Sequence, residues 1–234
     1  MIDGPTLLAD ALRAGVHVEE VFTSGGHDAV VTAAAEAGAT VREVTADVLE
    51  RATDTVTPQG VAAVAARFEV GIDDALAAMR SGPLGLVLVD VADPGNAGTL
   101  VRVAEAAGGA AVLFCGSSVD PSNAKCVRAS AGALFHVPIA SGGEVGGVLE
   151  RLGELGVRRI ATVVEGGTPY DEADLTGPVA VVLGSEAHGL GPAALEQVDE
   201  HVTIPMEGRS ESLNVAMAGS VLCFESLRQR RAAR

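Results

Sequence analysis

Cysteine is scarce in this chain of 234 residues, and the chain has no long apolar run. The three cysteines are odd in number and scattered through apolar segments, at Cys115, Cys126 and Cys223. This pattern fits neither a disulfide framework nor a cysteine-based zinc site, so we expect a reduced protein without a metal. No apolar run reaches the roughly 18 residues of a transmembrane helix, and the first residues lack the basic end and apolar core of a signal peptide. We therefore expect a cytoplasmic protein that does not enter a membrane.

Basic residues are also few. The chain has 16 lysines and arginines against 31 aspartates and glutamates, a formal net charge of −15. Such a charge repels nucleic acid on average, which argues against non-specific binding to RNA or DNA. Arginine nevertheless supplies 15 of the 16 basic residues, and its planar guanidinium suits bidentate contacts with phosphate. The composition therefore leaves room for a local arginine patch.

The first 68 residues alternate between helical and strand patterns. Apolar residues recur at helical spacing over residues 6–14, and residues 16–22 have the pattern of a strand. The alternation continues with a helix at 28–37, a strand at 40–44, a helix at 46–52, and a Pro/Gly turn leading into a last strand within 57–68. We expect residues 1–68 to form a small α/β domain. Residues 69–83 end in Ser-Gly-Pro and are predicted to be a linker.

Residues 84–234 have the pattern of an open α/β sheet. The run LGLVLVDV at 84–91 is continuously apolar, which is typical of a strand buried on both faces of a parallel sheet. Helical patterns separate it from further candidate strands at residues 110–115, 134–139, 158–164, 179–184 and 201–205. We expect a mainly parallel sheet, in which ligands usually lie beyond the carboxyl ends of the strands.

The first unusual loop is DPGNAG, residues 93–98. Proline and two glycines shape the turn, and Asn96 is expected to cap the helix that follows. Arg102 lies one to two turns into that helix, on the polar face. On spacing alone, the simpler interpretation of Arg102 is a surface arginine paired with Glu105.

The second unusual loop is LGSEAHGLGP, residues 183–192. Its first two glycines, Gly184 and Gly189, have the outer spacing of a phosphate loop, but Leu190 and Gly191 stand where Lys and Ser/Thr are required. The first strand of this segment is not followed by G-x-G-x-x-G either, so the usual dinucleotide fingerprint is missing. Glu186 could position a ligand or cap the next helix, and the sequence favours neither role.

The third is IPMEGRSESLNVAMAGSVLCFES, residues 204–226, where a polar loop meets a helix of small residues. Ser212 is the simplest N-cap. Gly219 lies inside the helix, where glycine costs ~1 kcal/mol relative to alanine. We expect another backbone or a partner subunit to pack closely against it.

Together these three stretches resemble the ordered motifs of the SpoU (TrmH-like) ribose 2′-O-methyltransferases of the SPOUT superfamily. The segment VRASAGALFHVPI, residues 127–139, is also similar to the central part of that family. The resemblance covers residues 84 to about 228. The opening IDGPTLLADAL is similar to the first helix of the family's L30e-like RNA-binding domain, which would make residues 1–68 the substrate-binding domain.

The resemblance implies a deep trefoil knot near the C-terminus and a cofactor, S-adenosylmethionine, held by the polar loop. It also implies a homodimer, with the small-residue helix beside the interface. The residues that it places at the cofactor are Gly184, Ile204, Met206 and Leu213. The catalytic polar set that it implies is Asn96, Arg102, Glu186, Ser212 and Asn214. Within this set Arg102 is expected to anchor a phosphate or an oxygen, since a free arginine holds its proton too firmly to act readily as a base.

The leading hypothesis is therefore an S-adenosylmethionine-dependent methyltransferase acting on a ribose of ribosomal RNA, with transfer RNA as the alternative. A second hypothesis is a non-catalytic RNA- or ribosome-binding module of the same fold. A third, a nucleotide-dependent small-molecule enzyme, is disfavoured by the missing fingerprints. His188 stays open between a surface role and that of a proton acceptor, because an imidazole titrates near neutrality.

Overall fold

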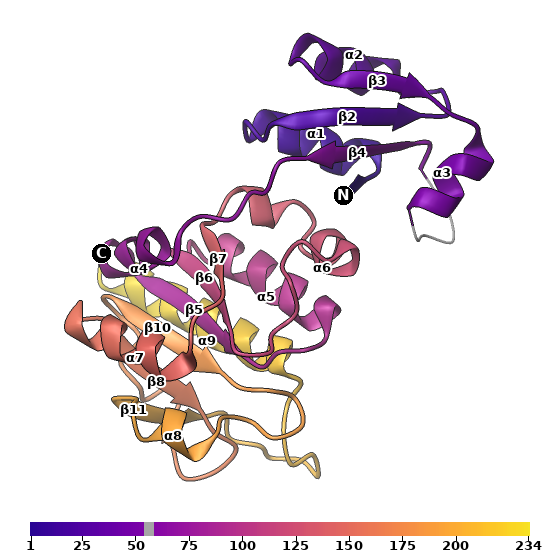
Figure 1. The fold of residues 1–234 in the computed structure, drawn as a ribbon. Helices are drawn as coiled ribbons and strands as arrows, with labels where there is room; N and C mark the ends of the chain where they lie inside the picture. The colour runs from indigo at the N-terminus through magenta and orange to yellow at the C-terminus, as the bar shows by residue number, and fades with distance from the viewer. Residues whose placement is uncertain (54–58) are drawn as a thin grey trace. The chain divides into compact units, whose positions relative to one another are not determined.

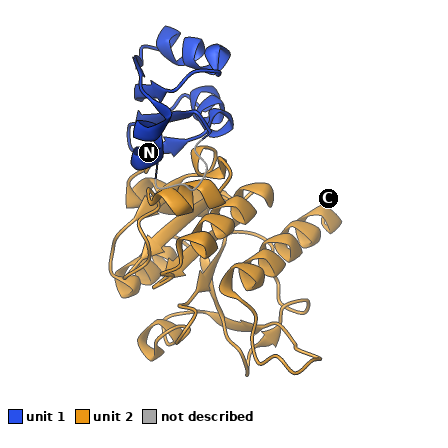
Figure 2. Ribbon diagram, turned by 90° about the vertical axis from the view of Figure 1, so that its right-hand side faces the viewer, with its two compact units in different colours: residues 1–68 blue, residues 69–234 orange. Residues whose placement is uncertain are grey.

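The computed structural model describes residues 1–53 and 59–234, and the chain forms two compact units, Met1–Phe68 and Glu69–Arg234 (Figure 2). Pro58, part of the turn predicted before the last strand of the first unit, lies outside the described residues. Among the described residues, none of the helices is long and apolar enough to cross a membrane.

The first unit is a four-stranded sheet with helices between its strands, as the alternating pattern predicts. Its strand order is β1-β4-β2-β3, with β2 and β3 parallel and β4 antiparallel to both β1 and β2. The core side chains include Leu8, Val21 and Val61, all within 1% of complete burial. Its elements are β1 Ile2–Asp3, α1 Pro5–Arg13, β2 Val18–Thr23, α2 Asp28–Glu36, β3 Thr40–Glu43, α3 Ala46–Ala52 and β4 Val61–Ala65.

The second unit is built on a seven-stranded sheet of order β7-β6-β5-β10-β8-β11-β9, in which every neighbouring pair is parallel (Figure 1). Its strands are β5 Leu84–Val89, β6 Ala111–Cys115, β7 Ile139–Ser141, β8 Arg158–Thr162, β9 Thr168–Pro169, β10 Val179–Leu183 and β11 Glu200–Thr203. Every residue of β5 and β10 is buried. The predicted mainly parallel sheet is confirmed, and the apolar run that begins at Leu84 forms the buried strand β5, as expected.

Helices cover both faces of this sheet. The helices of the second unit are α4 Ile72–Ser81, α5 Pro94–Ala106, α6 Ala124–Ala129, α7 Val145–Glu154, α8 Pro192–Leu195 and α9 Val215–Ala232. Side chains of α4, α7 and α8 share one apolar core with β5 and β10. Helix α9 packs against α5 and β10, and Figure 1 shows it behind the sheet, opposite α7. The unit therefore has three layers.

The order of the strands brings the loops after β5 and β10 together. The chain runs from β5 outward to β6 and β7 on one side, and places β8, β10 and β11 on the other. Because β5 and β10 are parallel neighbours, in register from Leu84 and Val179 onward, their carboxyl ends lie side by side. Such a switch in strand order is where open α/β sheets bind ligands.

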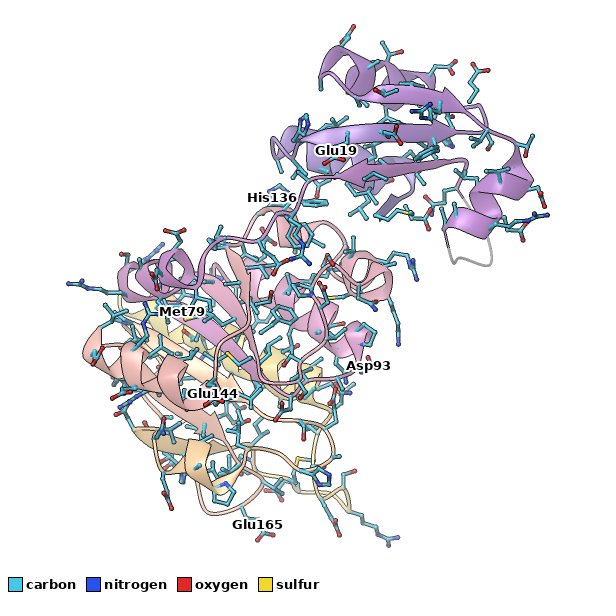
Figure 3. The ribbon with its side chains drawn as sticks, viewed as in Figure 1. Glu19, Met79, Asp93, His136, Glu144 and Glu165 are labelled. Carbon is cyan, nitrogen blue, oxygen red and sulfur yellow. The ribbon has the colours of Figure 1, made fainter. Side chains whose placement is uncertain are left out.

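The predicted linker, residues 69–83, is instead largely helical. Its helix α4 buries Ala75, Leu76 and Met79 completely in the core of the second unit, and Figure 3 labels Met79 on this helix. Gly85 of β5 makes room for it, since a Cβ at Gly85 would lie 2.5 Å from Sδ of Met79. The Ser-Gly-Pro sequence therefore marks the end of a packed helix.

The strand predicted at residues 134–139 is also wrong for most of its length. Residues Ala133–Phe135 form a short 3-10 helix, and β7 begins only at Ile139. Gly132, with φ 91°, starts the turn, and Pro138 has no N–H to donate to a neighbouring strand. Sheet pairing therefore starts at the carbonyl of Pro138, which accepts a hydrogen bond from the N–H of Val112.

The close packing expected at Gly219 is present, but its partners differ from the expectation. A Cβ at Gly219 would collide with Cδ2 of Leu100 on α5 and would lie 3.1 Å from Cδ1 of Leu183 on β10. The close contacts of Gly219 within the chain are therefore with leucine side chains. This contact fixes α9 against α5.

Candidate functional site

Three side chains from the three unusual loops form one hydrogen-bonded chain. The side chain of Asn214 donates to Oδ1 of Asn96 at 3.0 Å, and Nδ2 of Asn96 donates to Oε1 of Glu186 at 2.8 Å. The partners in these two bonds are 118 and 90 residues apart in sequence. The fold therefore gathers at one place three residues that the resemblance assigns to the catalytic set.

Asn96 is free to make these bonds because another residue caps its helix. The N-cap of α5 is Asp93, whose Oδ1 accepts from the backbone N–H of Asn96 at 2.8 Å. The same carboxylate accepts from Nζ of Lys125 at 3.0 Å. These two partners, the N–H of Asn96 first, hold the pKa of Asp93 below its ordinary value. The predicted capping role of Asn96 is therefore wrong, and Asp93, labelled in Figure 3, has that role.

Asn214 is both a cap and a member of the chain. Its Oδ1 accepts from the backbone N–H groups of Ala216 at 2.9 Å and Met217 at 3.4 Å, at the start of α9. The simplest expectation, Ser212 as the cap, is wrong because the helix begins three residues later, at Val215. Ser212 is exposed in the preceding loop. The cap fixes the Asn214 side chain, so that its amide group points at Asn96.

The loop after β10 folds back on itself over Gly184. Ser185 and Gly189 exchange backbone hydrogen bonds of 3.2 and 2.9 Å, and the N–H of His188 donates to Oγ of Ser185 at 3.1 Å. A Cβ at Gly184 would lie 2.5 Å from both the carbonyl oxygen of Gly189 and the N–H nitrogen of Leu190. Only glycine fits there without moving the loop. Glu186 is exposed on this loop, where it accepts the bond from Asn96.

These loops enclose a cavity of about 550 Å³ beyond the carboxyl ends of β8, β10 and β11. The four residues expected at a cofactor, Gly184, Ile204, Met206 and Leu213, all line it. Of the expected catalytic set, Glu186, Ser212 and Asn214 line it as well. Asn96 borders it through its two hydrogen bonds. The cavity thus joins the second and third loops into one site.

Arg102 does not line the cavity. It lies on α5, six residues after Asn96, with its side chain exposed. Within the part of the chain that the structure describes, it forms no ion pair with Glu105, so the simpler interpretation of a paired surface arginine is not supported. Its guanidinium is available to a ligand that reaches beyond the cavity.

Several lining residues were not predicted. Thr162, the last residue of β8, forms one wall of the cavity with Val163 and Val164, and the third loop contributes Glu211. The signal for the first three was the predicted strand at 158–164, which becomes informative only when β8 is known to pair with β10. His188 also lines the cavity and is exposed, so it is placed where a proton acceptor could reach a bound ligand.

Family models match nearly the whole chain. The model of the SpoU rRNA methylase family matches residues 83–224, and that of the RNA 2′-O ribose methyltransferase substrate-binding domain matches residues 1–70. The first match contains the first two loops, the third stretch up to residue 224, and every residue that lines the cavity. The second match spans the first compact unit.

Individual relatives agree with these matches. The chain is 32% identical to the 23S rRNA (guanosine(2553)-2′-O)-methyltransferase RlmP of Bacillus subtilis, over 96% of this chain and 86% of that protein. It is 35% identical to an uncharacterised tRNA/rRNA methyltransferase of Mycobacterium avium, over 97% and 77% of the two chains. The structure of an AdoMet-bound rRNA methyltransferase from Sinorhizobium meliloti superposes with a TM-score of 0.84 at 29% identity, covering 97% of this chain and 86% of that one. The chain belongs to the SpoU rRNA methylase family.

Proposed function

We propose that this protein transfers a methyl group from S-adenosylmethionine to the 2′-hydroxyl of a ribose in ribosomal RNA. The observation that carries the proposal is the joining of the three family motifs, through Asn96, Glu186 and Asn214, at the edge of one cavity. The 23S rRNA activity in the name of the Bacillus subtilis relative favours ribosomal RNA over transfer RNA. A ribosomal substrate in turn favours a cytoplasmic location.

The cavity fits the cofactor in size and lining. Its volume of about 550 Å³ lies within the range of sites for drug-sized ligands, which are mostly apolar with a few polar groups. Ile204, Met206 and Leu213 offer apolar surface to an adenosine, and backbone groups beside Gly184 offer hydrogen bonds. We assign cofactor binding to these four residues.

The cofactor, when bound, supplies a methyl group on a positively charged sulfur. The chain has to bring the ribose hydroxyl into line with that methyl group and give its proton a route away. We assign the first task to the bridge of Asn96, Glu186 and Asn214, which is held rigid from three loops. Ser212, at the cavity wall, adds a hydroxyl that can donate or accept.

Arg102 and His188 complete the assignment. Arg102, exposed beyond the cavity on α5, is assigned to a phosphate or oxygen of the RNA, because guanidinium keeps its proton and binds phosphate well. We assign the acceptance of the hydroxyl proton to Glu186 or His188, two of the ionisable side chains that line the cavity. A pH-rate profile of the Glu186→Gln and His188→Gln variants distinguishes the two: the variant of the acceptor loses the limb that reports its ionisation.

The proposal includes a homodimer and a trefoil knot. Met217 and Phe224 on α9 are 61% and 49% exposed, which supports a second copy packing on this helix. The match of residues 83–224 to the SpoU family, whose members the resemblance describes as knotted, supports the knot. Pulling the chain from both ends in an optical trap tests the knot: a knotted chain is shorter when fully stretched than its residue count gives, and full extension would refute it.

Calorimetric titration with S-adenosylmethionine and with S-adenosylhomocysteine tests the cofactor site. We expect one site per chain in the wild type, and none in the Gly184→Val variant, whose side chain would displace the loop at Gly189 and Leu190. The matched control is Gly191→Val, since a Cβ at Gly191 meets nothing within 4 Å. Methylation assays with radioactive cofactor on purified 23S rRNA and on bulk transfer RNA then identify the substrate. A folded wild-type protein that binds neither ligand, with or without RNA, would refute the proposal.

A further inference from the structure

The only lysine of the chain lies beside the hydrogen-bonded bridge. Nζ of Lys125, at the start of α6, is 3.0 Å from Oδ2 of Asp93. A Cβ at Gly95 would lie 3.4 Å from Cε and 3.6 Å from Nζ of this lysine. Gly95 directly precedes Asn96 in the sequence. The ammonium group of Lys125 therefore lies next to the residue that precedes the bridge of Asn96, Glu186 and Asn214.

Gly98 of the first loop makes room for α6. A Cβ at Gly98 would collide with the carbonyl oxygen of Cys126 and would lie 2.7 Å from Cβ of Ala129. Arg102 follows Gly98 by four residues and therefore lies on the same side of α5, one turn further along. We call the close approach of α5 and α6 the junction. Lys125 lies on its α6 side, and Arg102 and the bridge residue Asn96 lie on α5.

Lys125 keeps hydrogen-bonding capacity for a ligand. Its side chain is 58% exposed, and its ammonium has three donors, of which Asp93 takes one. The partner carboxylate has a second hydrogen bond as well, since Asp93 accepts from the N–H of Asn96 at 2.8 Å. A phosphate could therefore approach the ammonium without displacing its partner.

The first unit, by contrast, offers little positive charge. Residues 1–68 contain four arginines against ten acidic residues. Arg13 pairs with Asp10, Arg42 with Glu20 and Arg51 with Asp47, and the fourth, Arg67, is not free either. Phosphate contacts made by free cations would account for the salt dependence of RNA binding. In this unit each such contact would involve a cation that already has a partner, as Lys125 has in Asp93, whereas Arg102 on α5 forms no ion pair among the described residues.

We propose that Lys125 is a positioning residue that binds an RNA phosphate beside the target ribose, and that the junction of α5 and α6 supplies more of the phosphate contacts than residues 1–68 do. This inference rests on the proposed function, because it takes RNA as the ligand. Lys125 would fix the RNA backbone relative to Asn96. Arg102 would bind a second phosphate or oxygen of the RNA, one to two turns further along α5. The ammonium acts on the position of the ribose and does not touch the transferred methyl group.

Equilibrium binding to in-vitro-transcribed 23S rRNA, measured by filter retention between about 50 and 200 mM salt, tests the inference without requiring methyl transfer. We expect Lys125→Ala to weaken binding and to reduce the slope of log K against log salt by about one, which is the contribution of one phosphate contact. Lys125→Arg keeps the charge and should restore the slope. The matched control is Arg42→Ala, which removes one positive charge from the first unit and should leave the slope unchanged.

Two further measurements separate this role from a structural one. If Lys125 contacts phosphate, Lys125→Ala raises the KM for RNA while the calorimetric affinity for S-adenosylmethionine stays at its wild-type value. If Lys125 only supports the Asp93 cap, the variant loses cofactor affinity and stability at an unchanged salt slope, and the inference is wrong. It is equally wrong if Arg42→Ala reduces the slope as much as Lys125→Ala does. Cofactor binding by the wild type, measured separately, reports on the proposed function itself.

Discussion

The side chain of Asn214 donates a hydrogen bond of 3.0 Å to Oδ1 of Asn96, although 118 residues separate the two in sequence. Asn96 lies in the first turn of α5, and Asn214 is the N-cap of α9. The side chain of Asn96 in turn donates a hydrogen bond to Glu186. The bond therefore fixes two helix starts and the loop after β10 relative to one another. A site held in this way loses little entropy when a substrate binds.

The two functions of Asn214 can be separated by substitution. Asn214→Asp keeps an oxygen that can cap Ala216 and Met217 but removes the N–H donated to Asn96. We expect its stability to stay near that of the wild type, and its kcat for methyl transfer to fall roughly 10²-fold, because a small misplacement of a catalytic group has that effect. Asn214→Ala should also lose about 1 kcal/mol of unfolding free energy with the cap. Urea unfolding and steady-state methyl transfer measure the two effects, and equal stability losses in both variants would contradict the separation.

Two glycines in helices should respond to alanine in opposite directions. Gly219→Ala places a Cβ against Leu100 and Leu183, and overpacking of this kind costs typically ~1–3 kcal/mol. Gly147→Ala in α7 meets nothing within 4 Å, so the higher helix propensity of alanine should stabilise the protein by ~0.5–1 kcal/mol. Urea midpoints at one fixed protein concentration measure both. A Gly219→Ala variant as stable as Gly147→Ala would show that α9 can move away from α5.

Sequence patterns predict the buried centre of the second unit well, because local composition determines it. The run LGLVLV is typical of a strand covered on both faces, and all six residues are buried. Caps are harder to predict: Asp93 and Asn96 are both good cap residues near one helix start, and only the observed backbone selects Asp93. Packing across the sheet is harder still. Nothing local to residues 69–83 shows that Met79 fills the space left by Gly85, so a buried helix resembled a linker.

The candidate site was predictable only in part, because some of its residues are placed by packing across the sheet and not by local sequence. The residues of the second and third loops that line the cavity come from motifs that can be recognised in sequence. The wall from Thr162 to Val164 has no motif, because its position depends on β8 pairing with β10. The place of Arg102 outside the cavity likewise follows from the direction of α5 rather than from any spacing.

Acid should destabilise the protein partly through Asp199. Its carboxylate accepts from Nε of Arg159 at 2.9 Å and from Nη2 at 2.6 Å, and these bonds, more than the backbone bond from the same residue, hold the pKa of Asp199 below its ordinary value. A depressed folded pKa stabilises the protein above the unfolded pKa of about 3.9, and that contribution is lost as pH falls through the lower folded value. Asp199→Asn should therefore be less stable than the wild type at pH 7, and the difference should shrink below about pH 4. Urea unfolding across this range measures it, and a difference independent of pH would show that the carboxylate charge is not the cause.

The exposed apolar side chains of α9 should determine the association of two copies. Phe224 follows Met217 by seven residues, so the two lie two turns apart on one side of the helix, and both are largely exposed. Phe224→Glu places a charge within the proposed interface, and sedimentation equilibrium should show a shift from dimer to monomer. Val48→Glu is the control, because Val48 is a comparably exposed apolar residue of the first unit, at 48% against 49% for Phe224, and it should leave the dimer intact. A Phe224→Glu protein that remains dimeric at micromolar concentration would place the interface elsewhere. If the monomer still binds S-adenosylmethionine with wild-type affinity, the cavity is complete within one chain, and any loss of methyl transfer then comes from RNA binding across two copies.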